Sequence, residues 1–248
     1  MGSMNASTLK RLAIVDQVRG LAIIGVVVFH FVWDLDFTNL ITPGLASHPI
    51  WIAFGRLLAG TFMFLVGVSL VLAHRETLHW QQAIRRVLKI AFFALIITVA
   101  TYLVFPSAFV FYGILHAISV ASILGLFLLR LPTFVILAVG GVVWLAPLFF
   151  TNDAFDSRWL AWIGFSQTPP ISNDLVPVFP WFGITLMGIA ATRLVTNSGK
   201  NSWFEGVALQ NRAGKFLSFC GRHSLIIYML HQPLLLGIII PLSNWPRG

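Results

Sequence analysis

Long apolar runs with almost no charges constrain this chain more than any other feature of its sequence. A helix that crosses a bilayer needs about 20 predominantly apolar residues, and the 248-residue chain holds several such runs. Apolar residues make up 58% of the chain and charged residues 10%, whereas an average soluble domain is about 45–50% apolar and about 25% charged. The mean hydropathy is +0.87. These values exclude an ordinary soluble domain and a disordered chain, and they predict an integral membrane protein.

The apolar runs predict one all-α domain over residues 1–248, built as a single bundle of about seven transmembrane helices. Pro132 favours the first turn of a helix, so it separates the fourth run from the fifth. Residues 1–10 are expected to be a short cytoplasmic tail, with residues 1–3 an expression-vector remnant before Met4. The polar stretch 196–219 is expected to be a cytoplasmic loop. The expected spans are 12–33, 51–73, 87–105, 113–129, 131–150, 176–192 and 223–242.

The basic residues predict which side of the membrane each end of the chain faces. Lys and Arg concentrate in the short loops on the cytoplasmic side of membrane proteins. With seven spans and a cytoplasmic N-terminus, the outer segments hold only Arg158 and Arg247. The sequence therefore predicts an N-in, C-out topology, which explains the net charge of +8 without nucleic acid. The cytoplasmic set is Lys10, Arg11, Arg75, Arg85, Arg86, Lys89, Arg130, Arg193, Lys200, Arg212, Lys215 and Arg222.

The first apolar run carries Asp16, Arg19 and His30, and Asp34 lies just beyond its end; all four share one face. At about 100° per residue they lie within about 60° of one another, so this face should point into the bundle. The i,i+3 spacing of Asp16 and Arg19 predicts a salt bridge. Asp34, four residues after His30, could orient the imidazole as a general base requires. A histidine that only hydrogen-bonds between helices, beside a solvated aspartate, explains the second pair equally well.

Further polar residues lie inside the other apolar runs. Arg56 and His116 each lie about one turn into a run, and His231 lies near the middle of the last one. Each alone is more often a packing hydrogen bond than a site, but together with His30 they favour a polar cavity inside the bundle. Gly60 and Gly67 are expected to allow close helix packing.

Four sequence blocks resemble the heparan-α-glucosaminide N-acetyltransferase catalytic-domain family, in particular its bacterial members. They cover nearly the whole chain in the family's order. The resemblance implies a transmembrane acyltransferase of the bacterial inner membrane, which moves an acetyl group from cytosolic acetyl-CoA to an outer acceptor. The blocks are Asp16-x-x-Arg19-Gly20-Leu21-Ala22 with His30 and Asp34; Tyr112-Gly113-Ile114-Leu115-His116-Ala117-Ile118-Ser119; Pro177-Val178-Phe179-Pro180-Trp181-Phe182-Gly183; and Gly221-Arg222-His223-Ser224-Leu225-x-x-Tyr228-x-x-His231-Gln232-Pro233.

For that chemistry, His30 and Asp34 are the expected catalytic residues, and the acceptor is a hydroxyl or an amine, with a carbohydrate as the expected carrier. Three residues, Arg56, His116 and His231, are candidates for holding the substrate or the developing oxyanion. Direct transfer and an acetyl-histidine intermediate both stay open. Basic side chains could bind the CoA phosphates, although the cytoplasmic bias in charge explains most of them already. These candidates are Arg19, Arg85, Arg86, Lys89 and Arg222.

Other classes of membrane protein also have several apolar helices and buried polar residues. A polar intramembrane cavity would also serve a small-molecule transporter. A retinal protein needs a lysine in the middle of a span, and no run places one there. A haem or quinone carrier could use the intramembrane histidines as ligands. No metal is expected as a cofactor, the lone Cys220 cannot form an intrachain disulfide, and a homodimer stays open.

Overall fold

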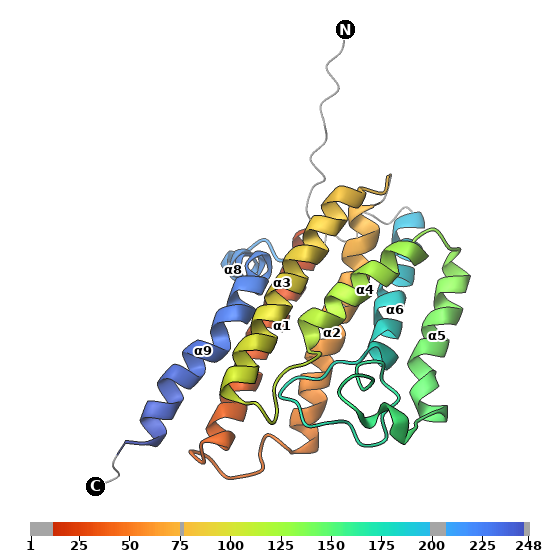
Figure 1. Cartoon of the computed structure of the whole chain (residues 1–248). Coiled ribbons are helices and arrows are strands. Elements are labelled where there is room, and N and C mark those ends of the chain that lie inside the picture. Colours follow the sequence, from red (N-terminus) through yellow and green to blue (C-terminus); the bar gives the residue numbers. More distant parts are fainter. Residues whose placement is uncertain (1–11, 75–76, 199–206, 246–248) are drawn as a thin grey trace.

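The computed structural model describes residues 12–74, 77–198 and 207–245. The regular structure among these residues is helical, with no strand beyond one isolated pairing between Tyr112 and Leu175. Seven apolar helices lie side by side and alternate in direction, so α1 begins at the end of the bundle opposite to the end of α9 (Figure 1). The elements are α1 (Ala13–Phe37), α2 (Pro49–Ala73), α3 (Trp80–Val104), α4 (Ile114–Leu128), α5 (Thr133–Phe149), the short 3-10 helix η1 (Asp153–Asp156), α6 (Val178–Asn197), α8 (Arg212–Arg222) and α9 (Ser224–Ser243).

Each expected span overlaps one of these helices, and local chemistry sets several of their ends. Pro49 opens α2 at a position where its missing N–H costs nothing, and the His48 side chain accepts a bond from the Ile50 N–H. Pro132 is the residue directly before α5, which confirms that a new helix starts there. Five helices, α1, α2, α3, α6 and α9, are long and apolar enough to cross a membrane. The helices α4 and α5 are apolar but shorter, with 15 and 17 residues.

Three boundaries differ from the expected ones. The helix α1 continues to Phe37, so Asp34 lies inside it rather than just beyond it. The helix α3 begins at Trp80, seven residues before the expected span, because polar residues at a membrane helix end need not break the helix. The expected loop 196–219 contains the start of α8, which is amphipathic and therefore has no long apolar run. Five basic residues of the charge argument, Lys10, Arg11, Arg75, Lys200 and Arg247, lie outside the described residues, as do residues 1–10.

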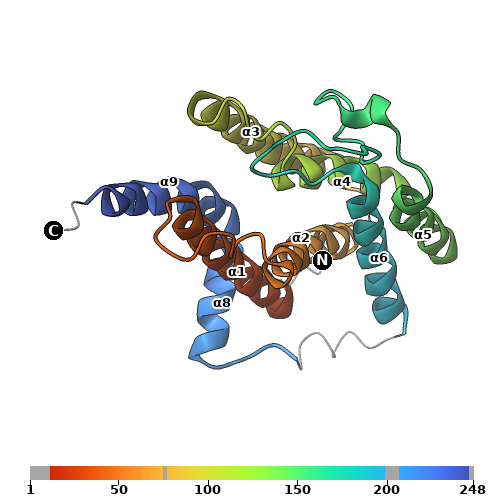
Figure 2. The same cartoon turned by 90° about the horizontal axis from the view of Figure 1, so that it is seen from below.

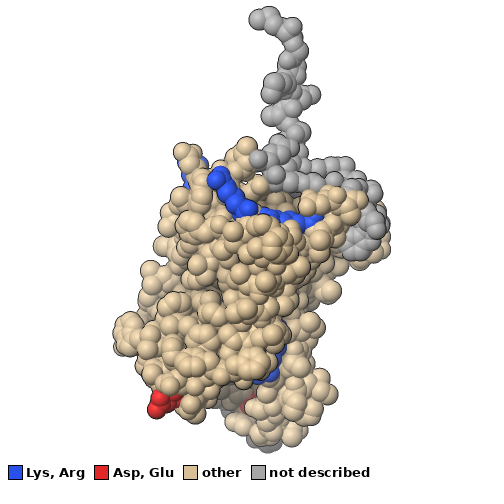
Figure 3. All heavy atoms as spheres, turned by 90° about the vertical axis from the view of Figure 1, so that its right-hand side faces the viewer, with Lys and Arg blue, Asp and Glu red and all other residues tan. Residues whose placement is uncertain are grey.

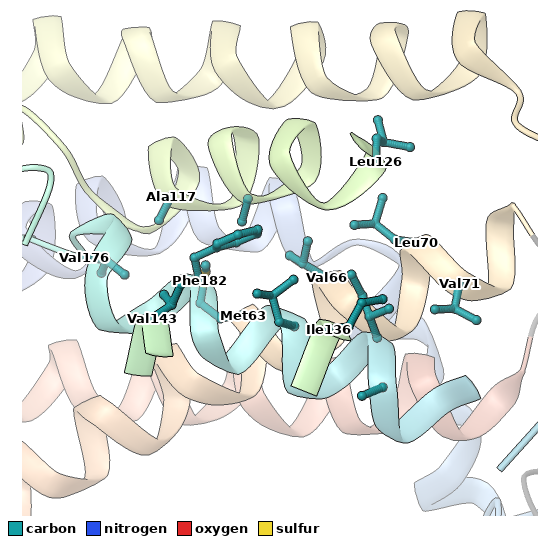
Figure 4. Packing of buried hydrophobic residues seen from close by; sticks show 14 of the residues in the cluster. Met63, Val66, Leu70, Val71, Ala117, Leu126, Ile136, Val143, Val176 and Phe182 are labelled. Carbon is teal, nitrogen blue, oxygen red and sulfur yellow. The ribbon is translucent and has the colours of Figure 1, made fainter. Parts of the chain in front are cut away.

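The apolar core lies between α2, α4, α5 and α6 (Figure 4). The cluster joins Met63 and Leu70 from α2 with Phe182 from α6, Leu126 from α4 and Ile136 from α5, and Leu126 lies beside Leu70. The helices α2 and α6 come into backbone contact at Gly67 and Gly188. A Cβ at Gly67 would collide with the Thr185 carbonyl oxygen, so the expectation of close packing at Gly67 is confirmed.

A second group of helices consists of α1, α8 and α9. The short helix α8 lies across the end of the bundle, seen end-on in Figure 1 and lengthwise in Figure 2. It crosses α1 so closely that a Cβ on Gly20 or Gly221 would overlap the backbone of the other helix. The Gln17 side chain supports this crossing, because it donates to the Gly214 carbonyl in α8 at 3.3 Å. It also donates to the Leu209 carbonyl and accepts from the Leu209 N–H, both at 2.9 Å, just before α8 begins.

The charges divide the bundle into two ends. On the face shown in Figure 3, Lys and Arg gather mainly at the end where α1 begins, and acidic side chains appear at the other end. We call the first the basic end; its described basic residues are Arg19, Arg85, Arg86, Lys89, Arg130, Arg193, Arg212, Lys215 and Arg222. We call the second the acidic end; it holds Asp34, Asp36, Asp153, Asp156 and Asp174.

Candidate active site

A large cavity lies between the two groups of helices. Its volume is about 1060 Å³, and it is lined by residues from α1, α2, α3, α4, α6, α8 and α9 and from the segment before α6. It reaches from Asp16 and Arg222 at the basic end to His30 and Asp174 at the acidic end. Ligand sites commonly measure about 300–1,000 Å³, so this cavity is large enough for an extended ligand.

At the basic end, four basic side chains line the cavity: Arg19, Arg86, Lys89 and Arg222. The predicted salt bridge is confirmed, because Arg19 donates to the Asp16 carboxylate at 3.2 Å. Arg19 also donates to the Ser69 hydroxyl on α2 at 3.1 Å, which ties α1 to α2 at this level. Several positive charges in one cavity mouth suit a ligand that carries phosphates.

The other basic residues at this end do not line the cavity. Arg85 is adjacent to Arg86 in sequence but is absent from the cavity wall, because consecutive residues on a helix point about 100° apart. The Arg193 guanidinium donates to the carbonyls of Leu129 and Leu131, and so caps the α4–α5 connection. The expectation that Arg85 helps to bind CoA therefore finds no support in the geometry.

At the acidic end, two histidines face each other. The rings of His30 and His231 lie 4.8 Å apart between centroids. The Nδ1–H of His231 donates to the Tyr228 carbonyl at 2.6 Å. This bond leaves the His231 Nε2 as an acceptor in the neutral ring, and that atom is buried with no partner among the described residues. The His30 ring makes no hydrogen bond to any described residue, and its Nδ1 is buried.

Asp34 does not contact His30 in the way the i,i+4 spacing suggests. Its Oδ1 accepts from the Gln232 Nε2 at 2.7 Å, and its Oδ2 is buried without a partner among the described residues. The side chain therefore points toward α9, and Asp34 is completely buried. The carboxylate joins α1 to α9 beside the two histidines rather than orienting the His30 ring through a hydrogen bond.

Asp174 belongs to this site, although the sequence did not single it out. It lies in the segment before α6 and lines the cavity. Its Oδ2 accepts from the Ile114 N–H at 2.8 Å and from the Tyr228 hydroxyl at 3.3 Å. Burial raises the pKa of the Asp174 carboxyl from 3.8 to about 6, against the opposing effect of these two hydrogen bonds. No local pattern could have revealed this residue, since its partners are 60 and 54 residues away.

Two expected site residues lie elsewhere. His116 caps the start of α4: its Nδ1 accepts from the Gly113 N–H at 3.2 Å and its Nε2 lies 3.3 Å from the Thr98 hydroxyl. Arg56 lines a second hollow, separate from the cavity of His30. Neither residue can reach an oxyanion beside His30, because neither lines that cavity. Among the described residues, no three His, Cys, Asp or Glu side chains gather as a metal site would require.

The comparisons with known proteins agree with the resemblance seen in the sequence blocks. The model of the family "Heparan-alpha-glucosaminide N-acetyltransferase, catalytic" matches residues 11–233. Neither the curated proteins nor the solved structures give a match to this chain. The matched range includes the cavity and both of its ends. This chain, with its apolar helices and acyltransferase-like sequence, therefore belongs to the heparan-α-glucosaminide N-acetyltransferase catalytic-domain family.

Proposed function

We propose that this protein transfers an acetyl group from acetyl-CoA, bound at the basic end, to a hydroxyl or amine of a carbohydrate-like acceptor at the acidic end. One observation carries the proposal: a single cavity has four basic side chains at one end and His30, near His231, with Asp174 at the other. Arg19 and His30 lie about 16 Å apart along α1. An acyl thioester on a long arm fits this arrangement, because its phosphates can stay at the basic end while the acetyl group reaches the histidines.

We assign His30 as the general base of this reaction. Its ring lines the cavity and has no described hydrogen-bond partner, so a ring nitrogen is free to accept the proton of the acceptor. The acceptor oxygen or nitrogen then bonds to the thioester carbon, the carbon–sulfur bond breaks, and the CoA sulfur leaves and takes up the proton from His30. The buried Asp34 carboxylate would stabilise the positive charge that His30 carries in between.

Asp174 is suited to hold the acceptor. Only its Oδ2 is bonded to Ile114 and Tyr228, so its second oxygen remains to accept a bond from a hydroxyl or an ammonium group. The position of Asp174 at the acidic end of the cavity supports the assignment of that end to the acceptor.

We place the basic end in the cytosol of a bacterium, with seven spans and the C-terminus outside. The concentration of Lys and Arg at this end supports that orientation, and acetyl-CoA would then enter from the cytosol. The helices α4 and α5 would cross as the shortest spans, which their neighbours α2 and α6 support by direct packing.

The test is acetyl transfer by purified protein in detergent, with radiolabelled acetyl-CoA and a mixture of amino sugars and neutral sugars. Time-dependent release of free CoA with the label on a sugar supports the proposal. A transporter that uses the same cavity would bind its cargo in detergent but leave the thioester intact, so unchanged acetyl-CoA would overturn the enzymatic proposal.

A pair of adjacent arginines tests the donor site. Arg86 lines the cavity and Arg85 does not, so the two charge reversals change the net charge equally at almost the same place. We expect Arg86→Glu to weaken acetyl-CoA binding at least tenfold and Arg85→Glu to change it little, by isothermal titration. Wild-type affinity should also fall as salt rises, because partly exposed charges are screened. Equal losses in both variants would mean that these residues act only through overall charge.

A further inference from the structure

A second hollow on the other side of α2 is not used by the proposed reaction. It measures about 970 Å³ and forms a groove whose floor is α2, with α1 on one flank and α5 and α6 on the other. Val15 and Leu65 line both this groove and the cavity, so their side chains separate the two. The groove is therefore a distinct site that shares one wall with the cavity.

Arg56 is the one charged residue among those lining the groove. Its side chain is exposed, and it makes no hydrogen bond, ion pair or ring contact with any described residue. A charged side chain at membrane depth is costly unless it finds a partner or reaches the interface. Arg56 lies seven residues into α2, about 10 Å from the end of the helix. At this depth the guanidinium can reach the level of lipid phosphates.

The Arg56 guanidinium and two tryptophan indoles lie at the acidic end of the groove. Trp181 lies three residues after the start of α6, and Trp144 lies five residues before the end of α5, so both are near the depth of Arg56. Neither the Trp144 nor the Trp181 indole N–H has a hydrogen-bond partner among the described residues. Tryptophans at this depth are typical of the membrane interface. The acidic end of the groove thus offers three hydrogen-bond donor groups, the Arg56 guanidinium and the indoles of Trp144 and Trp181, and no acidic residue lines the groove.

Toward the basic end the groove is apolar apart from Thr61, whose hydroxyl donates to the Leu57 carbonyl at 2.8 Å. It continues along α2 to Val68, about 18 Å from Arg56 along the helix axis, and Ile14 and Val18 from α1 line this part. Gly60 leaves room in the floor, since a Cβ there would meet only Ile184 and Trp181, at 3.5 and 3.7 Å. At this position Gly60 lines the groove, and the expectation of close helix packing there stays a prediction.

We infer that this groove binds an anionic phospholipid of the surrounding bilayer, with the phosphate against Arg56 and one acyl chain along α2. The donors at one end match a phosphodiester, and the apolar length beyond Gly60 matches a hydrocarbon chain. The net negative charge of the lipid complements Arg56, because no acidic residue lines the groove. This site is independent of the proposed acetyl transfer, and its occupant would brace α1 against α6 across α2.

The experiment measures binding of dioleoylphosphatidylglycerol to the purified, delipidated protein by native mass spectrometry, without acetyl-CoA. Dioleoylglycerol, which has the same chains and no phosphate, is the matched ligand. We expect phosphatidylglycerol to bind at least tenfold more tightly than dioleoylglycerol. Arg56→Gln should weaken phosphatidylglycerol about tenfold, because a hydrogen bond to a charged group is lost. Gly60→Leu should weaken it as well, because the new side chain fills the path of the acyl chain.

Arg158→Gln is the matched control. It removes one positive charge at the same end of the bundle as Arg56, but Arg158 does not line the groove. The Arg158 guanidinium donates instead to the Ser107 carbonyl. The Arg158→Gln variant should bind phosphatidylglycerol as the wild type does. Unchanged binding in Arg56→Gln or in Gly60→Leu would overturn the inference, and so would an equal loss in Arg158→Gln. Thermal unfolding of each variant without lipid shows whether it is folded. Arg56→Gln tests the phosphate contact, and Gly60→Leu tests the path of the acyl chain.

Discussion

His30 lines the acidic end of the cavity, and His231 lies beside it outside the cavity wall. Their hydrogen bonds give the two rings different capacities to take up a proton. The His231 Nδ1–H is committed to the Tyr228 carbonyl, so its ring is fixed in one tautomer. The His30 ring has no such bond, so it can take up or release a proton without breaking a hydrogen bond to a described residue. His30 is therefore the better base, and His231 is the residue that could accept a proton in its place.

The first residue-scale prediction concerns this base. A general base contributes about 10²–10⁴-fold to a reaction rate, so His30→Ala should lower the turnover number by that range. The dissociation constant of acetyl-CoA should stay nearly unchanged, because the phosphates bind at the other end. The control is His116→Ala, which removes a helix cap and should lower the melting temperature while turnover per folded molecule stays near wild type. Normal turnover by a folded His30→Ala protein would move the assignment to His231.

The second residue-scale prediction concerns Asp174 and pH. Its pKa is about 6 in the folded protein and 3.8 when unperturbed, so the folded state holds its proton more tightly. Its contribution to stability is full below about pH 3.8 and is lost as the pH rises through about 6. Asp174→Asn keeps an acceptor oxygen and removes the charge. The melting temperature of this variant, relative to wild type, should therefore rise between pH 4 and pH 7; a difference that stays constant with pH would contradict the assignment.

At the residue scale, helical periodicity predicted the polar face of α1 and the Asp16–Arg19 pair, because both depend only on positions within one helix. It could not predict that Asp34 bonds to Gln232, 198 residues away, or that Asp174 joins the site. The expected membrane depth of Arg56 and His116, counted from the ends of their apolar runs, also could not show whether they line the cavity. They lie near the level of His30, but the direction in which each side chain points depends on how the helices pack.

At the element scale, the crossing of α1 and α8 positions the basic end of the cavity. Gly221 touches the Asp16 backbone, and Arg222 follows it into the cavity wall. Asp16 in turn holds Arg19. The amphipathic α8 was not predicted, because a hydropathy window registers long apolar runs and not a short helix with one polar face. The apolar helices were predicted for the converse reason: their composition alone makes any other structure costly in lipid.

This crossing leads to the element-scale prediction. Gly221→Ala places a methyl group against the Asp16 carbonyl, so α8 must move away from α1. We expect a lower melting temperature and weaker acetyl-CoA binding, because both Arg222 and the Asp16–Arg19 pair would shift. Gly237→Ala in α9 is the control: nothing lies within 4 Å of the new methyl group, and alanine favours a helix over glycine by about 1 kcal/mol. It should melt no lower than wild type. Equal destabilisation in both variants would contradict the role assigned to the crossing.

At the scale of the whole molecule, two groups of helices meet around a single cavity, with opposite charge at its two ends. The group α2, α4, α5 and α6 shares the apolar core, while α1 and α9 supply the two histidines. The basic mouth combines Arg19 of α1 and Arg222 of α8 with Arg86 and Lys89 of α3. The helix α2 lies between the cavity and the lipid groove and contributes to both. The proposed donor site and the proposed acceptor site thus lie at opposite ends of one cavity.

The last prediction concerns the orientation of this molecule in the membrane. Most described basic residues lie at one end, and cytoplasmic loops carry an excess of Lys and Arg. We therefore expect the basic end inside. In a Cys220→Ser background, a cysteine at position 79, just before α3 at the basic end, should resist a membrane-impermeant maleimide on intact cells, and one at position 156 in η1 should react. After the membrane is permeabilised, both should react, which shows that position 79 is shielded by the membrane and not by the fold. Reaction of both positions in intact cells would require another topology, and the reverse pattern would place the acetyl-CoA end outside.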